Sequence, residues 1–416
     1  MFFRVSALFL LWCLLYSVSP AENSAPFRPN EFVAAVLEKH PSIRKVKHQV
    51  EAARFGLKAS GLQPNPSLTL AATLGDAGES ANALSQQFEI SGQPGIRKRM
   101  AQAILSQAEF QKEATMKDIK ILALLVWVKL WKTQRLSELA ELRFLLLSDM
   151  GRVALRRFEV GEISENESLR VDLAVAAAKA QKNQAEADAG AARGEASLLL
   201  GESAQAVDLS NPKEPETLLV STNLEEVLSE AAQHPALRSL NARYVALQSR
   251  AELIGKERAP ALNLSLYRSR IFQTSSVEQG VQLSMSWPIF DWGNIAHRKN
   301  QQEKTAEAFL DSIEERLLSN RQSLVQVWAN LEAARKNQDV LSLQASRYEE
   351  LAREARIAYD VGILGLADVL QTEQAFRQAG VNLVEAKASV LILELKVLSL
   401  TNIPLPRSFY QENVYD

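Results

Sequence analysis

Pro260-Ala261-Leu262-Asn263-Leu264-Ser265-Leu266 decides the fold, because the chain carries a similar stretch earlier, Pro66-Ser67-Leu68-Thr69-Leu70. The two stretches start 194 residues apart (260 − 66), and the pairs His40-Pro41 and His234-Pro235 have the same separation (234 − 40). No gap is needed between them. A unit of this size, repeated once, indicates a duplicated building block rather than a solenoid of many repeats.

Apolar and polar residues alternate within these stretches. In the second copy, Leu262, Leu264 and Leu266 alternate with polar neighbours, and Val281 to Trp287 continues the same pattern. A period of two predicts strands with one apolar and one polar face. The first copy predicts a similar pair, 67–72 and 84–90, on either side of a Gly/Asp/Ser-rich tip at 75–80. Strands of about ten residues are long enough to cross an outer membrane when tilted.

Long helical segments follow each strand pair. Residues 96–158 contain no proline and only one glycine, Gly151, and their apolar residues recur at steps of three, four or seven. Residues 294–359 repeat this pattern, and each segment is followed by an alanine-rich return helix, 164–200 and 366–400. Such lengths indicate coiled-coil-like packing. The chain turns at Phe158-Glu159-Val160-Gly161 and at Tyr359-Asp360-Val361-Gly362, which are 201 residues apart (362 − 161).

Short helices precede each strand pair. Asn30 is expected to cap a helix over 31–39, and Pro41 starts the next one, which runs to about residue 60. Asn223, His234 and Pro235 repeat this layout in the second copy. The predicted organisation is therefore a first repeat at 22–200, a linker at 201–222, a second repeat at 223–400 and a C-terminal tail at 401–416.

Residues 1–21 have the three parts of a secretory signal peptide. Arg4 is followed by an apolar run at 7–16 and by small residues that end at Ala21, where we expect cleavage. The single cysteine of the chain, Cys13, lies inside this run. The mature protein is therefore expected to contain neither disulfides nor a thiolate metal site.

Charge and hydropathy exclude two classes of protein. The chain has 47 Lys and Arg residues against 49 Asp and Glu, which lacks the basic excess of a nucleic-acid binder. No stretch after the signal reaches the roughly 18 consecutive apolar residues of a membrane-spanning helix, since the longest run, 119–131, is interrupted by Lys129. If this exported chain enters a membrane, it must do so as a closed β-barrel, because helices and closed barrels alone satisfy their backbones in lipid.

Four strands are too few to close a barrel, since small barrels start at about eight. An exported chain with four such strands must therefore share them with copies of itself. Three copies supply twelve strands, and cyclic symmetry is the natural way to close them around an axis. The paired long helices are expected to continue the same tube on one side of the membrane.

Several motifs resemble the TolC-like outer-membrane efflux family. They are the Pro-x-Leu-x-Leu strand starts, the passage Trp287-Pro288-Ile289-Phe290-Asp291-Trp292-Gly293, and the turn from Tyr359-x-x-Gly362 to Asp368-Val369-Leu370. The resemblance covers almost the whole mature chain. It implies a mainly α protein with a small β part, one subunit of a homotrimer with a twelve-stranded barrel in the outer membrane and an α-helical barrel in the periplasm.

The family resemblance also implies partners and a role. The channel is passive, an inner-membrane pump drives export, and a periplasmic adaptor binds near the hairpin tips. The chain is also similar to the branch that is paired with heavy-metal cation pumps of the resistance-nodulation-division type. The sequence does not identify the exported substrate, because a wide water-filled tube does not recognise what the pump selects.

Two groups of residues are the candidates for these roles. The polar strand faces are expected to line the barrel lumen, and the hairpin turns to form the gate and receive the adaptor. The lumen candidates are Asn263, Ser265, Gln282, Ser284 and Ser286. The gate and adaptor candidates are Val160, Gly161, Tyr359, Val361, Gly362, Leu364 and Asp368.

Each of these assignments has a simpler structural alternative. A turn glycine is needed at a helix end in any case, an acid near a helix start is favoured by the helix dipole, and a half-exposed sheet also alternates. Leu364 and Gln371 depart from family members that carry a basic and an acidic residue there, so we expect closure to rest more on apolar packing of Ile363, Leu364 and Leu366. Tyr267 and Trp287, near strand ends, are candidates for an interfacial aromatic girdle.

Other functions find little support in the residues. The four histidines, His40, His48, His234 and His297, have no partners at zinc-like spacing, and His40 and His234 are expected to cap helices, so we predict no metal site. The chain has no GxSxG, HExxH or phosphate-cradling glycine loop, so we predict no catalytic residues and no cofactor. The alternatives from other classes are a periplasmic adaptor with a coiled-coil hairpin and a structural coiled-coil protein of the cell envelope.

Overall fold

The structure is a computed structural model that describes residues 28–73, 78–201, 209, 211–219, 223–271, 274 and 276–406. The predicted signal peptide, 1–21, and the last part of the predicted tail, 407–416, lie outside the described residues. The described chain is mostly helical and contains one small antiparallel sheet. This confirms the predicted fold class.

The helices and strands follow the same order twice. The first series is α2 (Pro29–Lys39), α3 (Pro41–Ser60), β1 (Ser67–Thr73), β2 (Glu79–Glu89), α4 (Gln93–Glu159) and α5 (Glu165–Leu200). The second is α6 (Leu224–Ala232), α7 (Pro235–Gly255) with the short 3-10 helix η2 (Lys256–Arg258), β3 (Ala261–Ile271), β4 (Val277–Ser286), α8 (Asn294–Asp360) and α9 (Leu366–Leu400). Both α4 and α8 have 67 residues, which corresponds to a length of about 100 Å.

The short helices begin as their sequences indicate, with one correction. His40 and His234 are N-caps whose Nδ1 atoms accept hydrogen bonds from the backbone N–H groups of Ser42 and Ala236, both at 3.2 Å. Asn223 caps α6 as expected. The prediction that Asn30 caps the first helix is wrong, because α2 starts at Pro29, and the N–H of its N-cap residue, Arg28, donates to Glu31 at 3.0 Å.

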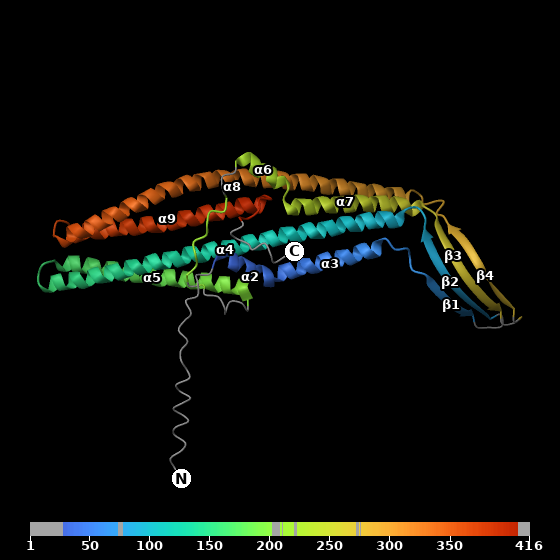
Figure 1. Cartoon of the computed structure of the whole chain (residues 1–416), viewed down its shortest axis with the longest axis horizontal. Helices are drawn as coiled ribbons and strands as arrows, with labels where there is room; N and C mark the ends of the chain where they lie inside the picture. The colour runs from blue at the N-terminus through green and yellow to red at the C-terminus, as the bar shows by residue number, and fades with distance from the viewer. Residues whose placement is uncertain are drawn as a thin grey trace, which may run out of the picture.

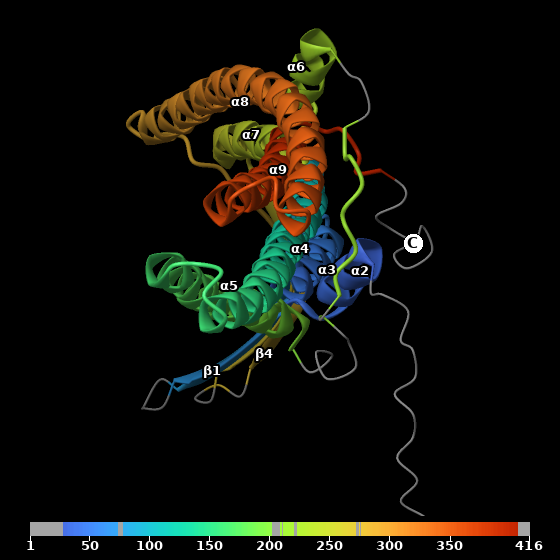
Figure 2. The same ribbon diagram turned by 90° about the vertical axis from the view of Figure 1, so that its left-hand side faces the viewer.

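The molecule is elongated, with the sheet at one end and two helical hairpins extending away from it (Figure 1). The hairpin tips, where α4 turns into α5 and α8 into α9, lie at the end opposite to the strands. Along the sheet-side half, α3 packs on α4, and α7 packs on both α4 and α8. Seen from the hairpin end, the two hairpins lie one beside the other and α8 follows a marked curve (Figure 2).

The main hydrophobic core lies at the middle of the helical part. Trp127 of α4 is fully buried there, with Phe32 of α2 at 5.5 Å between ring centroids. Residues 211–219 cross this region, and the carbonyl of Lys213 accepts a hydrogen bond from Trp127 Nε1 at 3.1 Å. Residues 211–219 of the predicted linker therefore contact both hairpins, since Glu214 also pairs with Lys387 of α9 at 2.8 Å.

All four strands form one sheet in the order β1-β2-β3-β4, and every neighbouring pair is antiparallel. The sequence predicts the two strand pairs, whereas the pairing of β2 with β3 that joins them comes from the structure. β1 and β4 are edge strands, since neither has a second strand partner in the described chain. None of the described helices is long and apolar enough to cross a membrane.

Candidate functional site: the two-faced sheet and the hairpin tips

The five residues predicted to line a lumen all lie on the same face of the sheet. The strand register places Asn263 opposite Ser284 and Ser265 opposite Gln282, while Ser286 lies opposite Ala261 on the same side. Ser265 also pairs with Ser85 of β2, and their hydroxyl oxygens are 2.9 Å apart. This polar face continues onto β1, where Ser67 lies opposite Ser85.

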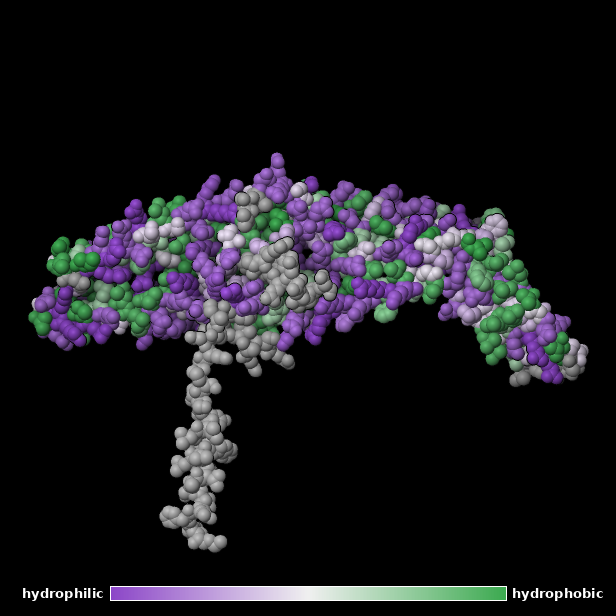
Figure 3. Space-filling view, in the orientation of Figure 1, coloured by the Kyte–Doolittle hydropathy of each residue, from purple (hydrophilic) through white to green (hydrophobic). Residues whose placement is uncertain are grey.

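The opposite face is apolar and exposed. One row of residues crosses all four strands: Leu68, Leu84, Leu266 and Val281. Their exposed fractions are 65, 46, 51 and 67% in the single chain. The space-filling view shows hydrophobic residues gathered over the sheet (Figure 3). A continuous apolar face of this kind normally contacts lipid or another protein.

The aromatic residues at the strand ends have defined local roles. Tyr267 lies opposite Gly280, and a Cβ added to this glycine would come within 3.1 Å of the tyrosine Oη, so the ring covers the glycine. Trp287 is 60% exposed and donates from Nε1 to the carbonyl of Arg258 at 3.2 Å. Further on, Trp292 has a left-handed backbone with φ 52° and is 91% exposed. The interfacial girdle assigned to Tyr267 and Trp287 stays a prediction.

Both hairpin tips turn through the same backbone motif. Gly161 and Gly362 have φ of 78° and 77°, a conformation that glycine adopts without strain. After α4, the N–H of Glu162 donates to the carbonyl of Arg157 at 2.8 Å; after α8, that of Ile363 donates to Ala358 at 2.8 Å. These are the 6→1 bonds of a Schellman C-cap. The glycines therefore have a conformational reason to be there, whatever else the tips do.

The tips of the two hairpins touch each other. Tyr359 of α8 packs on a small cluster formed by Ala154, Val171 and Leu366, and the guanidinium of Arg157 lies over its ring at 4.8 Å. This contact joins the end of the first hairpin to the end of the second. Tyr359 is thus a predicted tip residue that contacts the other hairpin.

The other predicted tip residues divide into exposed and half-buried ones. Val160 and Val361 are 71 and 65% exposed, and Asp368 is also exposed, one turn into α9. Leu364 is half-buried. Ile363, which we expected to pack with Leu364 and Leu366, is instead 80% exposed, whereas Leu366 is buried. Leu366 is therefore packed within the single chain and Ile363 is not, while the role of these residues in closure stays a prediction.

Sequence reasoning missed two buried carboxylates in the second hairpin. Glu373 of α9 is 3% exposed and forms an ion pair with Arg356 of α8. Glu394, fully buried, accepts a hydrogen bond from the N–H of Leu218 at 2.9 Å and pairs with Arg335 at 2.6 Å. The one available signal was their position on the apolar side of a helix, where charged residues rarely stand without a partner.

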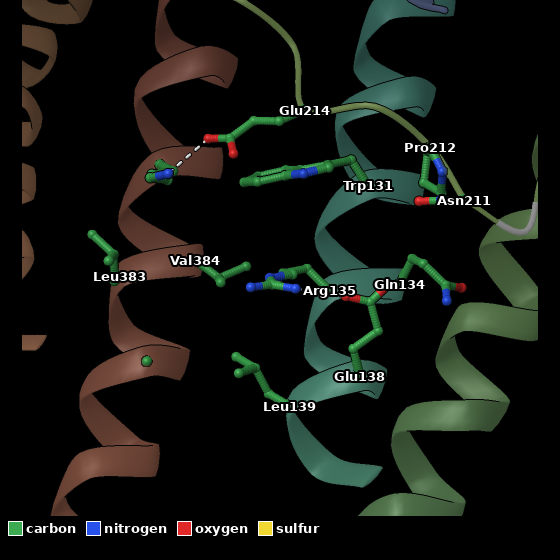
Figure 4. Close-up of a pocket in the computed structure, with 12 residues that line it drawn as sticks. Trp131, Gln134, Arg135, Glu138, Leu139, Asn211, Pro212, Glu214, Leu383 and Val384 are labelled. Carbon is green, nitrogen blue, oxygen red and sulfur yellow. Dashed lines mark hydrogen bonds and ion pairs between the residues drawn. The ribbon is translucent and has the colours of Figure 1, made fainter. Parts of the chain in front are cut away.

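A pocket of about 330 Å³ lies between α4, α9 and the linker (Figure 4). Trp131 and Arg135 of α4 line it, with Val384 of α9 on the opposite side and Glu214 of the linker above. Glu214 pairs with Lys387 at 2.8 Å. The pocket is thus bordered by the segment that ties the two hairpins together.

The histidines do not form a metal site in the described part of the chain. No three His, Cys, Asp or Glu side chains gather there in an arrangement that could hold an ion. His48 is highly exposed and lies 3.6 Å from Glu51. His234 is 6% exposed; burial, together with the nearby charge of Lys117, lowers its pKa to about 4, so its imidazole is neutral at pH 7. This agrees with the expected capping role of His40 and His234.

Comparison with protein families gives one match, over the second half of the chain. Residues 227–402 match the family described as outer membrane efflux protein (OEP). This match covers most of the second repeat. A comparison with curated protein sequences gives no match.

Solved structures extend the likeness to nearly the whole chain. The CmeC outer membrane channel of Campylobacter jejuni is 15% identical, with a TM-score of 0.73 over 93% of this chain and 87% of that one. The outer membrane protein VceC of Vibrio cholerae is 14% identical, with a TM-score of 0.73 over 90% of this chain and 96% of its own. CusC is 14% identical, with a TM-score of 0.74 over 91% of this chain and 92% of its own. The chain therefore has the fold of TolC-like outer-membrane channels, which confirms the resemblance seen in the sequence.

Proposed function

We propose that this protein is the outer-membrane channel of a tripartite efflux system. Three copies form one tube, in which the first and second repeats, 22–200 and 223–400, contribute equivalent parts of the wall. The twelve strands make a barrel in the outer membrane, and the six helical hairpins extend into the periplasm. An inner-membrane pump supplies the driving force, and conduction through the tube involves no bond chemistry.

The observation that carries this proposal is the two-faced sheet with open edges. β1 and β4 lack outer partners in the described chain, and unpaired strand edges are not tolerated in lipid. Pairing β4 of one copy with β1 of the next satisfies both edges. It also places the row of Leu68, Leu84, Leu266 and Val281 against lipid and the row of Ser85, Ser265 and Gln282 around water.

The hairpin tips support the position of the gate and of the adaptor site. Tyr359 and Arg157 link the two hairpins of one chain, so a change in this contact alters how far the tips stand apart. Val160, Val361 and Asp368 remain exposed and are available to a periplasmic adaptor. We therefore assign Val160, Gly161, Tyr359, Val361, Gly362, Leu364 and Asp368 to the gate and adaptor region. The exported substrate is left open, and export of heavy-metal cations stays an expectation from the resemblance.

Two adjacent residues of β4 test the faces of the sheet. Val281→Lys places a charge on the lipid side, where it costs about 2–4 kcal/mol near the bilayer midplane, and we expect it to abolish membrane-inserted trimers. Gln282→Lys places the same charge on the water side, and we expect trimers of normal yield with a shifted cation preference in planar bilayers. Trimers are counted by native mass spectrometry.

The reverse outcome would contradict the assignment of the faces. If Val281→Lys assembles normally while Gln282→Lys does not, the apolar row does not face lipid. A wild-type protein that stays monomeric and gives no conductance would refute the channel itself and favour the alternatives, a periplasmic adaptor or a structural coiled-coil protein.

A further inference from the structure

At the end of the sheet where the chain passes from β1 to β2 and from β3 to β4, basic and acidic residues lie on opposite faces. Arg268 and Arg270 follow Leu266 at alternate positions of β3, so they lie on the apolar face. The register places Arg268 between Asn82 and Gln279, and Arg270 between Ser80 and Val277. The acidic residues of this end, Glu79 and Glu278, lie on the opposite, polar face.

Of the two acids, Glu79 has a hydrogen-bond partner on the polar face. Ser269 Oγ donates a hydrogen bond to the carboxylate of Glu79. Arg268 and Arg270 are exposed, and among the described residues no carboxylate forms an ion pair with either guanidinium. Two cationic side chains thus extend from this face beyond the apolar row, among the neutral polar residues Asn82, Ser80 and Gln279 and without an anion inside the described chain.

The distance of the arginines from the other end of the sheet can be calculated along the strands. Gln279, the neighbour of Arg268, is eight residues before Trp287, which directly follows β4; this corresponds to about 27 Å along the strand direction. With a strand tilt of about 40°, this becomes about 20 Å along the barrel axis, close to the apolar band of about 25 Å in outer-membrane barrels. Trp287 lies between β4 and α8, and the helices extend away from that end of the sheet (Figure 1), so the arginines mark the end away from the periplasm.

We propose that Arg268 and Arg270 bind the phosphate groups of lipids in the outer leaflet of the membrane. This rests on the proposed function, which places the apolar face in lipid. At the border of the apolar band, the groups that a side chain meets are lipid headgroups, and their anions are phosphates. Guanidinium groups bind phosphate through paired, charge-assisted hydrogen bonds, which an apolar surface nearby strengthens by excluding water.

The spacing fits a lipid that carries two phosphates. Residues two apart on one strand face are separated by about 7 Å, so each guanidinium can hold one phosphate of the same headgroup. Three copies of the chain would provide three such pairs around the barrel. The site would fix the depth of the barrel in the membrane from its outer side.

Native mass spectrometry of the full-length trimer in detergent tests the proposal, with bisphosphorylated lipid A and its dephosphorylated form as probes. We expect the wild type to bind the phosphorylated lipid about tenfold more tightly, and R268Q/R270Q to lose this preference. The control R250Q/R321Q removes two exposed arginines from α7 and α8, and should keep the wild-type preference. Inorganic phosphate is added as a competitor to separate binding of a free anion from binding of a lipid.

Each outcome decides between the possibilities. An equal preference in wild type and R268Q/R270Q, or an equal loss in R250Q/R321Q, overturns the site. Full displacement of the lipid by millimolar-range inorganic phosphate would show a free-anion site and also overturn the lipid assignment. Conductance of R268Q/R270Q in planar bilayers is recorded in parallel: channels that conduct without the lipid preference support the site, and wild-type protein that forms no channels counts against the proposed function instead.

Discussion

The two helical hairpins have nearly the same length but bury different chemistry. Glu373 is 3% exposed, while the residue 201 positions earlier, Asp172 in the first hairpin, lies at the surface. Likewise Glu394 is fully buried, and its counterpart Arg193 is exposed. The two hairpins therefore share their backbone layout, while the interior of the second holds ion pairs that the first lacks at these positions.

The buried ion pair of Glu394 and Arg335 also holds the linker between the two repeats. Glu394 receives the N–H of Leu218 from the linker, and Arg335 donates to the carbonyl of Leu219 at 3.1 Å. The linker thus ends in hydrogen bonds to the second hairpin, after contacting Trp127 of the first. The comparison predicts that substitutions in the second hairpin will cost more than the same substitutions at matched positions of the first.

The largest difference is expected at Glu394. Glu394→Ala removes the partner of Arg335 and of the Leu218 N–H, and breaking a buried pair of this kind should lower the free energy of unfolding by about 4 kcal/mol. Arg193→Ala, at the matched surface position, should change it by less than about 0.5 kcal/mol. Urea titration of the detergent-solubilised protein measures both, and equal effects would remove the distinction between the hairpins.

A second contrast concerns the two capping histidines. The pKa of His234 is about 4 in the folded chain, below its ordinary value of 6.5, so the unfolded chain binds more protons between these values. His234 therefore contributes stability that is fully present above pH 6.5 and is lost as the pH falls toward 4, by up to about 3 kcal/mol.

His234→Gln should flatten this dependence, measured as the unfolding midpoint between pH 4 and 7. His40→Gln replaces the matched cap of α3 and serves as the control. A midpoint that still falls with the wild-type slope in His234→Gln would show that another group is responsible.

Near the tips, the contrast between Glu373 and Asp172 should be smaller. Glu373→Gln removes the charge that pairs with Arg356, and we expect a loss of about 2 kcal/mol, because the Arg356 side chain is 41% exposed and water screens part of the pair. Asp172→Asn should have almost no effect. The variants are compared by thermal unfolding, and a loss of equal size in both would contradict the role of burial.

The smallest stability effects are expected at the starts of the return helices. Ser164 and Glu167 form a capping box at the start of α5, in which the Ser164 N–H donates to Glu167 at 3.1 Å. Glu167→Lys should therefore weaken this helix start by about 1 kcal/mol, read from hydrogen exchange of the first turn of α5.

Asp368 occupies the matched position in α9, where Gly365 is the N-cap and offers no side chain for such a box. Asp368→Lys should change conductance or adaptor affinity, because this carboxylate is free to act at the tip. Wild-type values for both quantities in Asp368→Lys would remove Asp368 from the gate and adaptor region.

Much of the fold is readable from local patterns. The ends of α9 agree with the predicted return helix 366–400, and α5 starts one residue after the predicted start at 164, because helix periodicity depends on near neighbours. The two faces of the sheet follow from alternation alone. The start of α2 was not predicted correctly. Pro29 is the first helical residue, and the carboxylate of Glu31 accepts a hydrogen bond from the N–H of Arg28, so Arg28 rather than Asn30 is the N-cap.

The missed features depend on residues that are far apart in the chain. Glu394 meets Leu218 across 176 positions, and Tyr359 meets Arg157 across the gap between hairpins. Periodicity marks such residues as helical and cannot name their partners. The pairing of β2 with β3 is of the same kind, since the two strands are separated by an entire helical hairpin.

The open edges of β1 and β4 also bear on the life of the chain before assembly. A newly exported copy presents two rows of unpaired backbone groups beside an uncovered stripe of leucines, which is a template for wrong pairing. The time for which an unassembled copy avoids wrong pairing then depends on how soon it meets other copies of the chain. Assembly yield should therefore rise with the rate of export. The unpaired edges and the exposed leucines that create this risk both belong to the sheet.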